Sequence, residues 1–416
     1  MSISKLSHRD CLNRLSDHLS TERYSRGVAH NYLAAVRRFL EYSERVDLSI
    51  EEMRRPDVER YLSTLRLFRK LRSRPRRSAR WIRRIHRSAI HMLLRVIEAQ
   101  WPSPVSHTTE RDLFEEEIVK EYDEWMSNLR GLSVVTREDR RSEALRFLKW
   151  LEKRDEGGEL ANLAVADIDA YVQCRSVGVR RATLKSITTK LRSFLRHLHL
   201  AGRTSRDLST AVIGPTLYAL EGIPSALRAA DVTKVLQVTR RDRTPIGRRD
   251  YAILALLSVY GMRAGEITSL RLEDVDWKRS RLHVRHSKTG ATSELPLLRV
   301  PGDAILDYLR EGRPETALRE VFLRSRAPYR AFRCGSTLYT PIRRRLAAAG
   351  VNPPGRKGPH AFRHARAVSL LRSSVSLKVI GDVLGHRSVD STAAYLKLAT
   401  EDLRAVALEI PVAVLS

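Results

Sequence analysis

The chain has 416 residues, of which 76 are Lys or Arg and 48 are Asp or Glu, so its formal charge at pH 7 is +28. At 42% hydrophobic and 30% charged residues it can build buried cores and cover them, which excludes an intrinsically disordered protein. The three Cys residues form no C-x-x-C pair, and the longest nearly apolar run, residues 251–262, is shorter than the ~20 residues of a membrane span; a disulfide framework, a Cys-based zinc site and a membrane-spanning protein are therefore disfavoured.

Two stretches of the chain show the same order of helical patterns. Each has a helix with apolar positions three and four residues apart, then a short helix with acidic and aromatic residues, then a basic helix. Tyr61 matches Tyr171 and Phe39 matches Phe147, which predicts a repeated helical module. The alternative is that amphipathic helices resemble one another by pattern alone. The segments concerned are 31–44, 55–62 and 83–100 in the first stretch, and 141–153, 165–172 and 184–202 in the second.

An arginine-rich segment, residues 69–88, leads into the basic helix of the first stretch and contains no acidic residue. A solvated face is the alternative, but so many uncompensated charges repel one another unless an anion covers them. With the net charge, the segment predicts a nucleic-acid partner, DNA or RNA, because guanidinium groups donate forked hydrogen bonds to phosphate oxygens. An anionic membrane is disfavoured, because no basic amphipathic helix stands apart from the folded sequence. The candidate phosphate-binding residues are Arg72, Arg74, Arg76, Arg77, Arg80, Arg83 and Arg84.

Two segments interrupt the helical patterns and indicate domain boundaries. Residues 101–110 are rich in Pro, Ser and Thr, and residues 202–225 contain several Gly and Pro. They divide the chain into an N-terminal helical module (1–100), a second helical module (111–213) and a C-terminal region (226–416).

The C-terminal region combines helices with one short β-hairpin. Apolar residues alternate in RLHVRHS and TSELPL around the turn KTGA, within residues 281–297, which predicts the hairpin. Lys288 lies at its tip, where a Lys is normally a solubility residue. Earlier in the chain, Arg263 follows an apolar helix that ends at Gly261, and Glu266 could hold its guanidinium in one rotamer.

Further along the chain, between residues 360 and 395, side chains with imidazole and phenol groups lie close together in sequence. HAFRH places His360, Arg363 and His364 near one helical face. A zinc pair at the two histidines is the alternative, but the Glu of H-E-x-x-H is missing and no third ligand is evident. His386 follows a glycine in LGHRS, and Tyr395 comes later on an amphipathic helix, where a Tyr is more often a core residue than a nucleophile.

The order of these motifs resembles the catalytic signature of the tyrosine recombinase family, the phage-integrase-type site-specific recombinases. The motifs are, in sequence, an Arg in GxRxGE, a Lys on a hairpin, H-x-x-R-H, L-G-H and a Tyr. The resemblance covers the C-terminal region in detail and the second module more loosely. It implies a mainly α fold, in which two helical, SAM-like DNA-binding modules precede a mixed, mostly α catalytic domain with a small β-hairpin, of the DNA breaking-rejoining type. The departures are Phe362, where Leu is more usual, and the additional module at residues 1–100, whose role stays open.

The resemblance implies an enzyme that cleaves and rejoins double-stranded DNA at specific sites through a 3′-phosphotyrosine. Two alternatives are a type IB topoisomerase-like nicking enzyme and a catalytically decayed, architectural DNA-binding protein. The second is disfavoured because every position of the catalytic signature holds a suitable residue. The implied catalytic residues are Arg263, Lys288, His360, Arg363, His386 and Tyr395.

Cofactors and partners follow from the same resemblance. Two arginines can neutralise the phosphate oxygens and no G-x-x-x-x-G-K loop is present, so we expect no cofactor, neither ATP nor a divalent metal. We expect a homotetramer on two DNA sites, with or without partner recombinases, in which residues 396–416 dock on a neighbouring protomer, and a role in a mobile element. The N-terminus lacks the apolar segment of a signal peptide, so we expect a cytoplasmic, nucleoid-associated protein.

Overall fold

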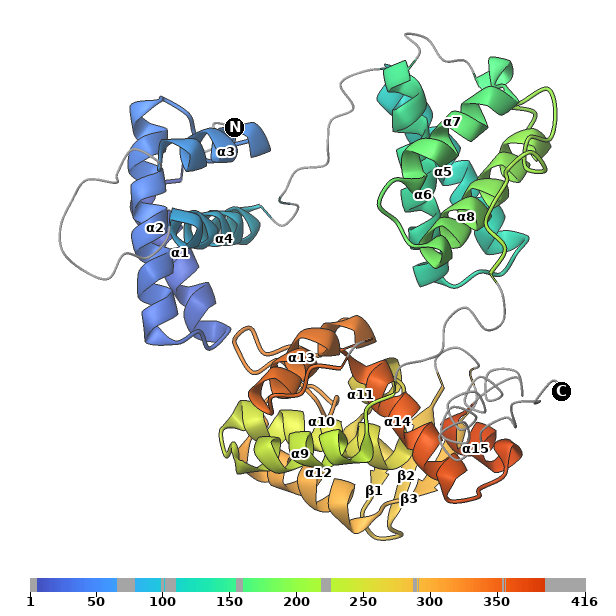
Figure 1. The fold of residues 1–416 in the computed structure, drawn as a ribbon. Coiled ribbons are helices and arrows are strands. Elements are labelled where there is room, and N and C mark those ends of the chain that lie inside the picture. The colour runs from blue at the N-terminus through green and yellow to red at the C-terminus, as the bar shows by residue number, and fades with distance from the viewer. Residues whose placement is uncertain are drawn as a thin grey trace, which may run out of the picture. The chain divides into compact units, whose positions relative to one another are not determined.

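The computed structural model describes residues 6–65, 79–98, 101, 110–154, 160–217, 226–286, 290, 292–353, 355 and 357–385. Its elements are mostly helices, with one small antiparallel sheet in the C-terminal region (Figure 1). By the contacts within the chain, residues 103–222 form one unit and the residues on either side of them form the other. Within the described ranges, no helix has both the length and the apolar character that a membrane crossing requires.

In the described part of the N-terminal module, four helices pack around a core to which Leu15 and Leu93 belong. Apolar residues three and four positions apart bring these side chains to one face of each helix. The third helix starts where Pro56 occupies its first turn and the Asp57 carboxylate accepts a hydrogen bond from the backbone N–H of Arg54 at 3.0 Å. The helices are α1 (His8–Thr21), α2 (Arg26–Arg45), α3 (Arg55–Thr64) and α4 (Ala79–Ile97).

The second module repeats this packing. In both modules the first helix packs on the second and the fourth, and the second and third pack on the fourth. Phe39 and Tyr61 meet edge to face with ring centroids 5.1 Å apart, and Phe147 and Tyr171 do so at 5.0 Å. The two stretches that resemble each other in sequence therefore share one pattern of helix packing. The elements of the second are α5 (Glu110–Asn128), α6 (Val134–Arg154), the 3-10 turn η1 (Leu160–Asn162), α7 (Val165–Ser176) and α8 (Arg181–Leu200).

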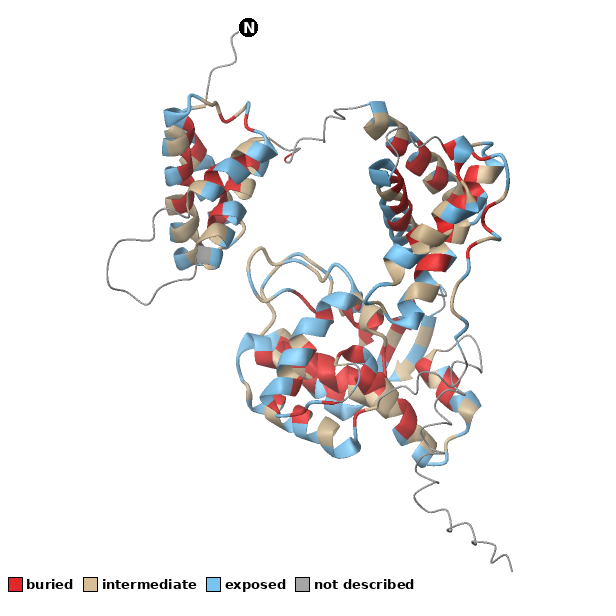
Figure 2. Ribbon diagram, turned by 45° about the horizontal axis from the view of Figure 1, so that its top comes forward, coloured by how far each residue is buried: buried red, intermediate tan, exposed pale blue. Residues whose placement is uncertain are grey.

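In the C-terminal region, α10 (Pro245–Tyr260) is buried on nearly all sides, because its residues from Ala252 to Leu257 are all apolar (Figure 2). The helices α9, α12, α13 and α14 pack against it, and the short helix α11 also contacts it. The apolar run that is too short for a membrane span is therefore the central helix of a core. The other helices of the region are α9 (Ala229–Arg241), α11 (Ala264–Thr268), η2 (Leu272–Asp274), α12 (Arg299–Glu311), η3 (Gly335–Leu338), α13 (Tyr339–Ala348), α14 (Pro359–Arg372) and α15 (Leu377–Leu384).

The sheet has the strand order β1-β2-β3 and is antiparallel throughout. Leu282 pairs with Leu295 and Val284 with Ser293, so the predicted hairpin is confirmed. Its Leu282 and Val284 side chains are buried against the helical core, as their alternation predicts. The additional two-residue strand was not predicted. The strands are β1 (Val275–Asp276), β2 (Arg281–Arg285) and β3 (Thr292–Pro296).

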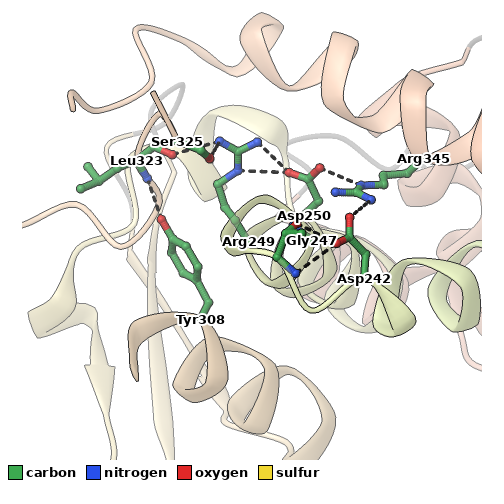
Figure 3. Close-up of polar contacts among 9 residues, drawn as sticks. Asp242, Gly247, Arg249, Asp250, Tyr308, Leu323, Ser325 and Arg345 are labelled. Atoms are coloured by element: carbon green, nitrogen blue, oxygen red, sulfur yellow. Dashed lines mark hydrogen bonds and ion pairs between the residues drawn. The ribbon is translucent and has the colours of Figure 1, made fainter. Parts of the chain in front are cut away.

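A chain of charges, buried at Arg249 and Asp250 and half-buried at its other end, connects the end of α9 with α10 and α13 (Figure 3). Asp250 lies between two arginines: Arg249 Nη2 donates to its Oδ1 at 2.8 Å, and Arg345 Nε donates to its Oδ2 at 2.8 Å. Arg345 also donates to Asp242 at 2.6 Å, and Arg249 donates to the carbonyl oxygen of Leu323 at 3.2 Å. Because removing one member leaves a buried charge uncompensated, the chain fixes these helices relative to one another.

Candidate active site

Arg263 is held by contacts to two different parts of the fold. It follows the end of α10 and caps α11, where Glu266 Oε2 accepts from its backbone N–H at 2.7 Å. Its Nη1 donates to Glu266 Oε1 at 2.9 Å, and its Nη2 donates to the carbonyl oxygen of Gly385 at 2.6 Å. The prediction that Glu266 fixes this guanidinium is confirmed.

Arg363 is held by two backbone carbonyl oxygens, one close to Arg263 in sequence and one next to Gly385. It is only 4% exposed, and it lies in the second turn of α14. Its Nη1 donates to the carbonyl oxygen of Gly261 at 2.7 Å, and its Nη2 donates to that of Leu384 at 2.6 Å. Gly261 lies two residues before Arg263, and Leu384 directly precedes Gly385. Both guanidinium groups therefore lie where the end of α10 meets the end of α15.

Glycines at these junctions make the close approach possible. Gly261 has φ 67° and Gly385 has φ 64°, both in the left-handed region. A Cβ at Gly261 would lie 2.6 Å from Leu384 Cδ2, which real contacts do not allow. The tight turn expected before residue 386 is therefore present, and the left-handed φ makes a larger side chain strained at either glycine.

The two histidines of the H-x-x-R-H motif lie at the start of α14. His360 is exposed, and its ring centroid lies 6.2 Å from that of His364. This places His360 one turn before Arg363, on the helix that delivers the buried guanidinium. Among the described residues, no group of three or more His, Cys, Asp or Glu is arranged to hold a metal ion.

The remaining predicted residues fall partly outside the described residues. Of the catalytic set, Lys288, His386 and Tyr395 lie outside them, as does the segment 396–416. Of the basic set, Arg80 and Arg84 are exposed on α4 and Arg83 is half-buried there. The rest of the basic set lies outside as well: Arg72, Arg74, Arg76 and Arg77.

An arginine-lined concavity of about 380 Å³ on the second module was not predicted. None of the described residues that line it is acidic. Its arginines are partly fixed: Arg140 Nη1 donates to Ser193 Oγ at 2.6 Å, and Arg192 Nη2 donates to a backbone carbonyl at 2.6 Å. A signal existed in the sequence, because Arg192 and Arg196 are four residues apart and share one face of α8. The concavity can accept the oxygens of a phosphate.

Comparison with known proteins agrees with this geometry. The chain matches the Phage integrase family over residues 225–402. The protein y4gC of Sinorhizobium fredii (strain NBRC 101917 / NGR234), whose name describes an integrase/recombinase, is 57% identical over 189 residues, which are 45% of this chain and 97% of that relative. The protein y4rF of the same strain, with a name of the same kind, is 30% identical over 402 residues, which are 96% of this chain and 91% of that relative.

Solved structures share the fold. A lambda integrase dimer bound to a COC′ core site has a TM-score of 0.53 at 18% identity, covering 74% of this chain and 86% of that one. The XerH site-specific recombinase bound to a palindromic difH substrate, in a post-cleavage complex, has a TM-score of 0.54 at 14% identity, covering 74% of this chain and 92% of that one. Together with the family match, the relatives y4gC and y4rF show that the chain belongs to the phage integrase family. It is a tyrosine recombinase, a DNA-binding enzyme of site-specific recombination.

Proposed function

We propose that Tyr395 attacks a phosphodiester of duplex DNA and forms a 3′-phosphotyrosine, which the 5′-hydroxyl of another strand then resolves. The observation that carries this proposal is the anchoring of Arg263 and Arg363 on backbone carbonyls at the end of α15. From there the chain continues directly to His386 and Tyr395. The two guanidinium groups supply positive charge where a phosphate would have to lie.

The arginines match the charge that develops during attack. When the phenolic oxygen bonds to phosphorus, negative charge grows on the two non-bridging oxygens. Arg263 and Arg363 would donate to these oxygens through N–H groups of their guanidinium forks. Since this charge comes from the protein, we expect cleavage in the presence of EDTA and without ATP.

Protons must leave the phenol and reach the departing oxygen. A phenol with a pKa of ~10 loses its proton as it attacks, and His360 would accept that proton or donate to a phosphate oxygen. The P–O5′ bond breaks, and Lys288 would protonate the 5′ oxygen. His386 would donate a further hydrogen bond to the phosphate.

The domain organisation that we propose follows the predicted boundaries: two helical modules at 1–100 and 111–213 bind DNA, and the catalytic domain extends over 226–416. The arginine-lined concavity of the second module and the basic face of α4 support this. Contacts to phosphate position the enzyme without reading sequence, so affinity should fall steeply with salt.

For assembly, we propose a homotetramer on two sites, in a mobile element whose DNA is integrated, excised, transposed or resolved. A solved lambda integrase tetramer bound to a Holliday junction has a TM-score of 0.52 to this chain, at 17% identity. Such an enzyme would act in the cytoplasm, at the nucleoid. Docking of the segment after Tyr395 on a neighbouring protomer would join the subunits.

The test is to map covalent protein–DNA adducts on the DNA that flanks the gene. We expect adducts at defined positions with the wild type and none with Tyr395→Phe, while Tyr395→Phe still shifts the same DNA in a gel. Exchange between two copies of the mapped site supports recombination. Relaxation of supercoils without paired sites would instead favour a topoisomerase-like enzyme, and absence of any adduct would favour a DNA-binding protein without catalysis.

A further inference from the structure

His286 joins the hairpin to the scaffold of the site. It directly follows β2, lies two residues before Lys288, and is 7% exposed. Its Nδ1 lies 2.7 Å from Glu266 Oε1, and its Nε2 lies 2.7 Å from the Oγ of Ser293 on β3. Both ring nitrogens therefore have partners, one on α11 and one on the facing strand.

The ionisation of Glu266 decides which nitrogen carries a proton. Burial would raise the pKa of its carboxyl group, but hydrogen bonds with His286 and with both the backbone and the side chain of Arg263 outweigh burial, so the pKa is lowered. The group is a carboxylate at neutral pH and accepts, so Nδ1 of His286 must donate. Because Oε1 also accepts from Arg263 Nη1 at 2.9 Å, one oxygen connects the histidine with the arginine.

The imidazole also packs against the turn after α15. A Cβ at Gly385 would lie 2.7 Å from Cε1 of His286, so the ring lies directly on the glycine backbone. The carbonyl oxygen of Gly385 accepts from Arg263 Nη2 at 2.6 Å. His286 thus contacts the two groups that orient Arg263, the Glu266 carboxylate and Gly385.

We propose that His286 is a positioning residue for the cleavage reaction: it donates from Nδ1 to Glu266 and holds Arg263, the root of the hairpin and the turn before His386 in one arrangement. This role requires no contact of His286 with DNA or with the reacting atoms. This proposal rests on the proposed function, because its effect is exerted through Arg263. Loss of the Nδ1 donor should slow cleavage and leave DNA binding unchanged.

The test uses His286→Ala, His286→Asn and His286→Gln in the full chain. An Asn amide can donate from near the position of Nδ1, whereas a Gln amide reaches the position of Nε2. The probe is a nicked duplex built on the site mapped by adducts, and single-turnover cleavage is measured at saturating DNA. We expect a rate loss of about 10- to 100-fold for His286→Ala, by analogy with residues that orient the ligands of a metal site. His286→Asn should recover most of the rate and His286→Gln should not.

The matched control is His283→Ala, a half-buried histidine on β2 itself, which should cleave at the wild-type rate. A His286→Ala rate within twofold of wild type would overturn the proposal. If His286→Ala does not fold, the other two variants decide: equal rates for His286→Asn and His286→Gln at equal melting temperatures would show that only packing matters. Failure of the wild type itself to form an adduct would instead refute the proposed function.

Discussion

Arg363 of the catalytic region and the exposed arginines of the helical modules are held in opposite ways. Arg363 is buried, and two backbone carbonyls fix its terminal nitrogens. Arg80 and Arg84 instead lie exposed on α4, and Arg196 lies exposed beside the concavity of the second module. A fixed guanidinium suits a group that must meet charge developing at one place, whereas exposed arginines suit phosphate contacts that only position DNA. Substitutions in the two regions should therefore separate cleavage from binding.

The largest effect is expected at Arg363. Arg363→Lys removes the forked donor that reaches both Gly261 and Leu384, and a lysine cannot replace that geometry. Single-turnover cleavage should fall by ~10²–10³-fold, by analogy with the loss of one oxyanion donor, while DNA affinity in a gel shift stays within about threefold. Arg310→Lys, an exposed arginine of α12, is the control and should behave as wild type. Equal cleavage rates for the two folded variants would show that cleavage does not need the fixed guanidinium of Arg363.

Substitution of a buried charge on α10 tests what stabilises the fold of the catalytic region. Asp250→Ala leaves Arg249 and Arg345 without their shared carboxylate, so the free energy of unfolding should fall by about 3–5 kcal/mol. Asp303→Ala breaks the exposed ion pair with Arg299 and should cost no more than about 1 kcal/mol. Chemical denaturation followed by circular dichroism measures both. Similar losses would show that burial does not set the contribution of these pairs.

A smaller effect is expected in the concavity of the second module. Arg192→Gln and Arg196→Gln should each weaken DNA binding and reduce the slope of log affinity against log salt by about one, the value for one lost phosphate contact. Cleavage at saturating DNA should not change. Lys120→Gln, an exposed lysine of α5 outside the lining residues, is the control. A wild-type slope in both arginine variants would show that phosphate does not enter the concavity.

The smallest effect is expected on α4. Arg80→Gln and Arg84→Gln should reduce the salt slope only with a duplex long enough to reach the N-terminal module, because this module is an addition to the part that resembles the family most closely. The measurement compares a short duplex centred on the cleavage site with a longer one. An identical slope for variant and wild type on the longer duplex would exclude α4 from the DNA interface.

The features that depend on local pattern were predictable. Spacing of three and four residues gave the helices, and alternation at Leu282 and Val284 gave the hairpin. The Arg263–Glu266 pair was also predictable, because both residues lie in the same short turn. Periodicity alone was enough to align Phe39 with Phe147, whose partners pack in the same way in both modules.

Features that join distant segments were not predictable. The contact between Arg363 and Gly261 connects residues 102 positions apart, and no local pattern specifies it. The concavity of the second module combines Arg140 of α6 with Arg192 of α8, which only the packing of the two helices brings together. In the sequence His286 occupied one position of an alternating strand, and its contact with Glu266 depends on how the hairpin packs on α11.

The most direct test of the account is to identify the amino acid that becomes linked to DNA. The wild-type protein is trapped on a nicked duplex carrying the mapped site, digested with nuclease and protease, and analysed by mass spectrometry. We predict a nucleotide attached through a 3′-phosphate to the peptide that contains Tyr395. Attachment to any other residue, or a covalent complex that persists in Tyr395→Phe, would contradict the account.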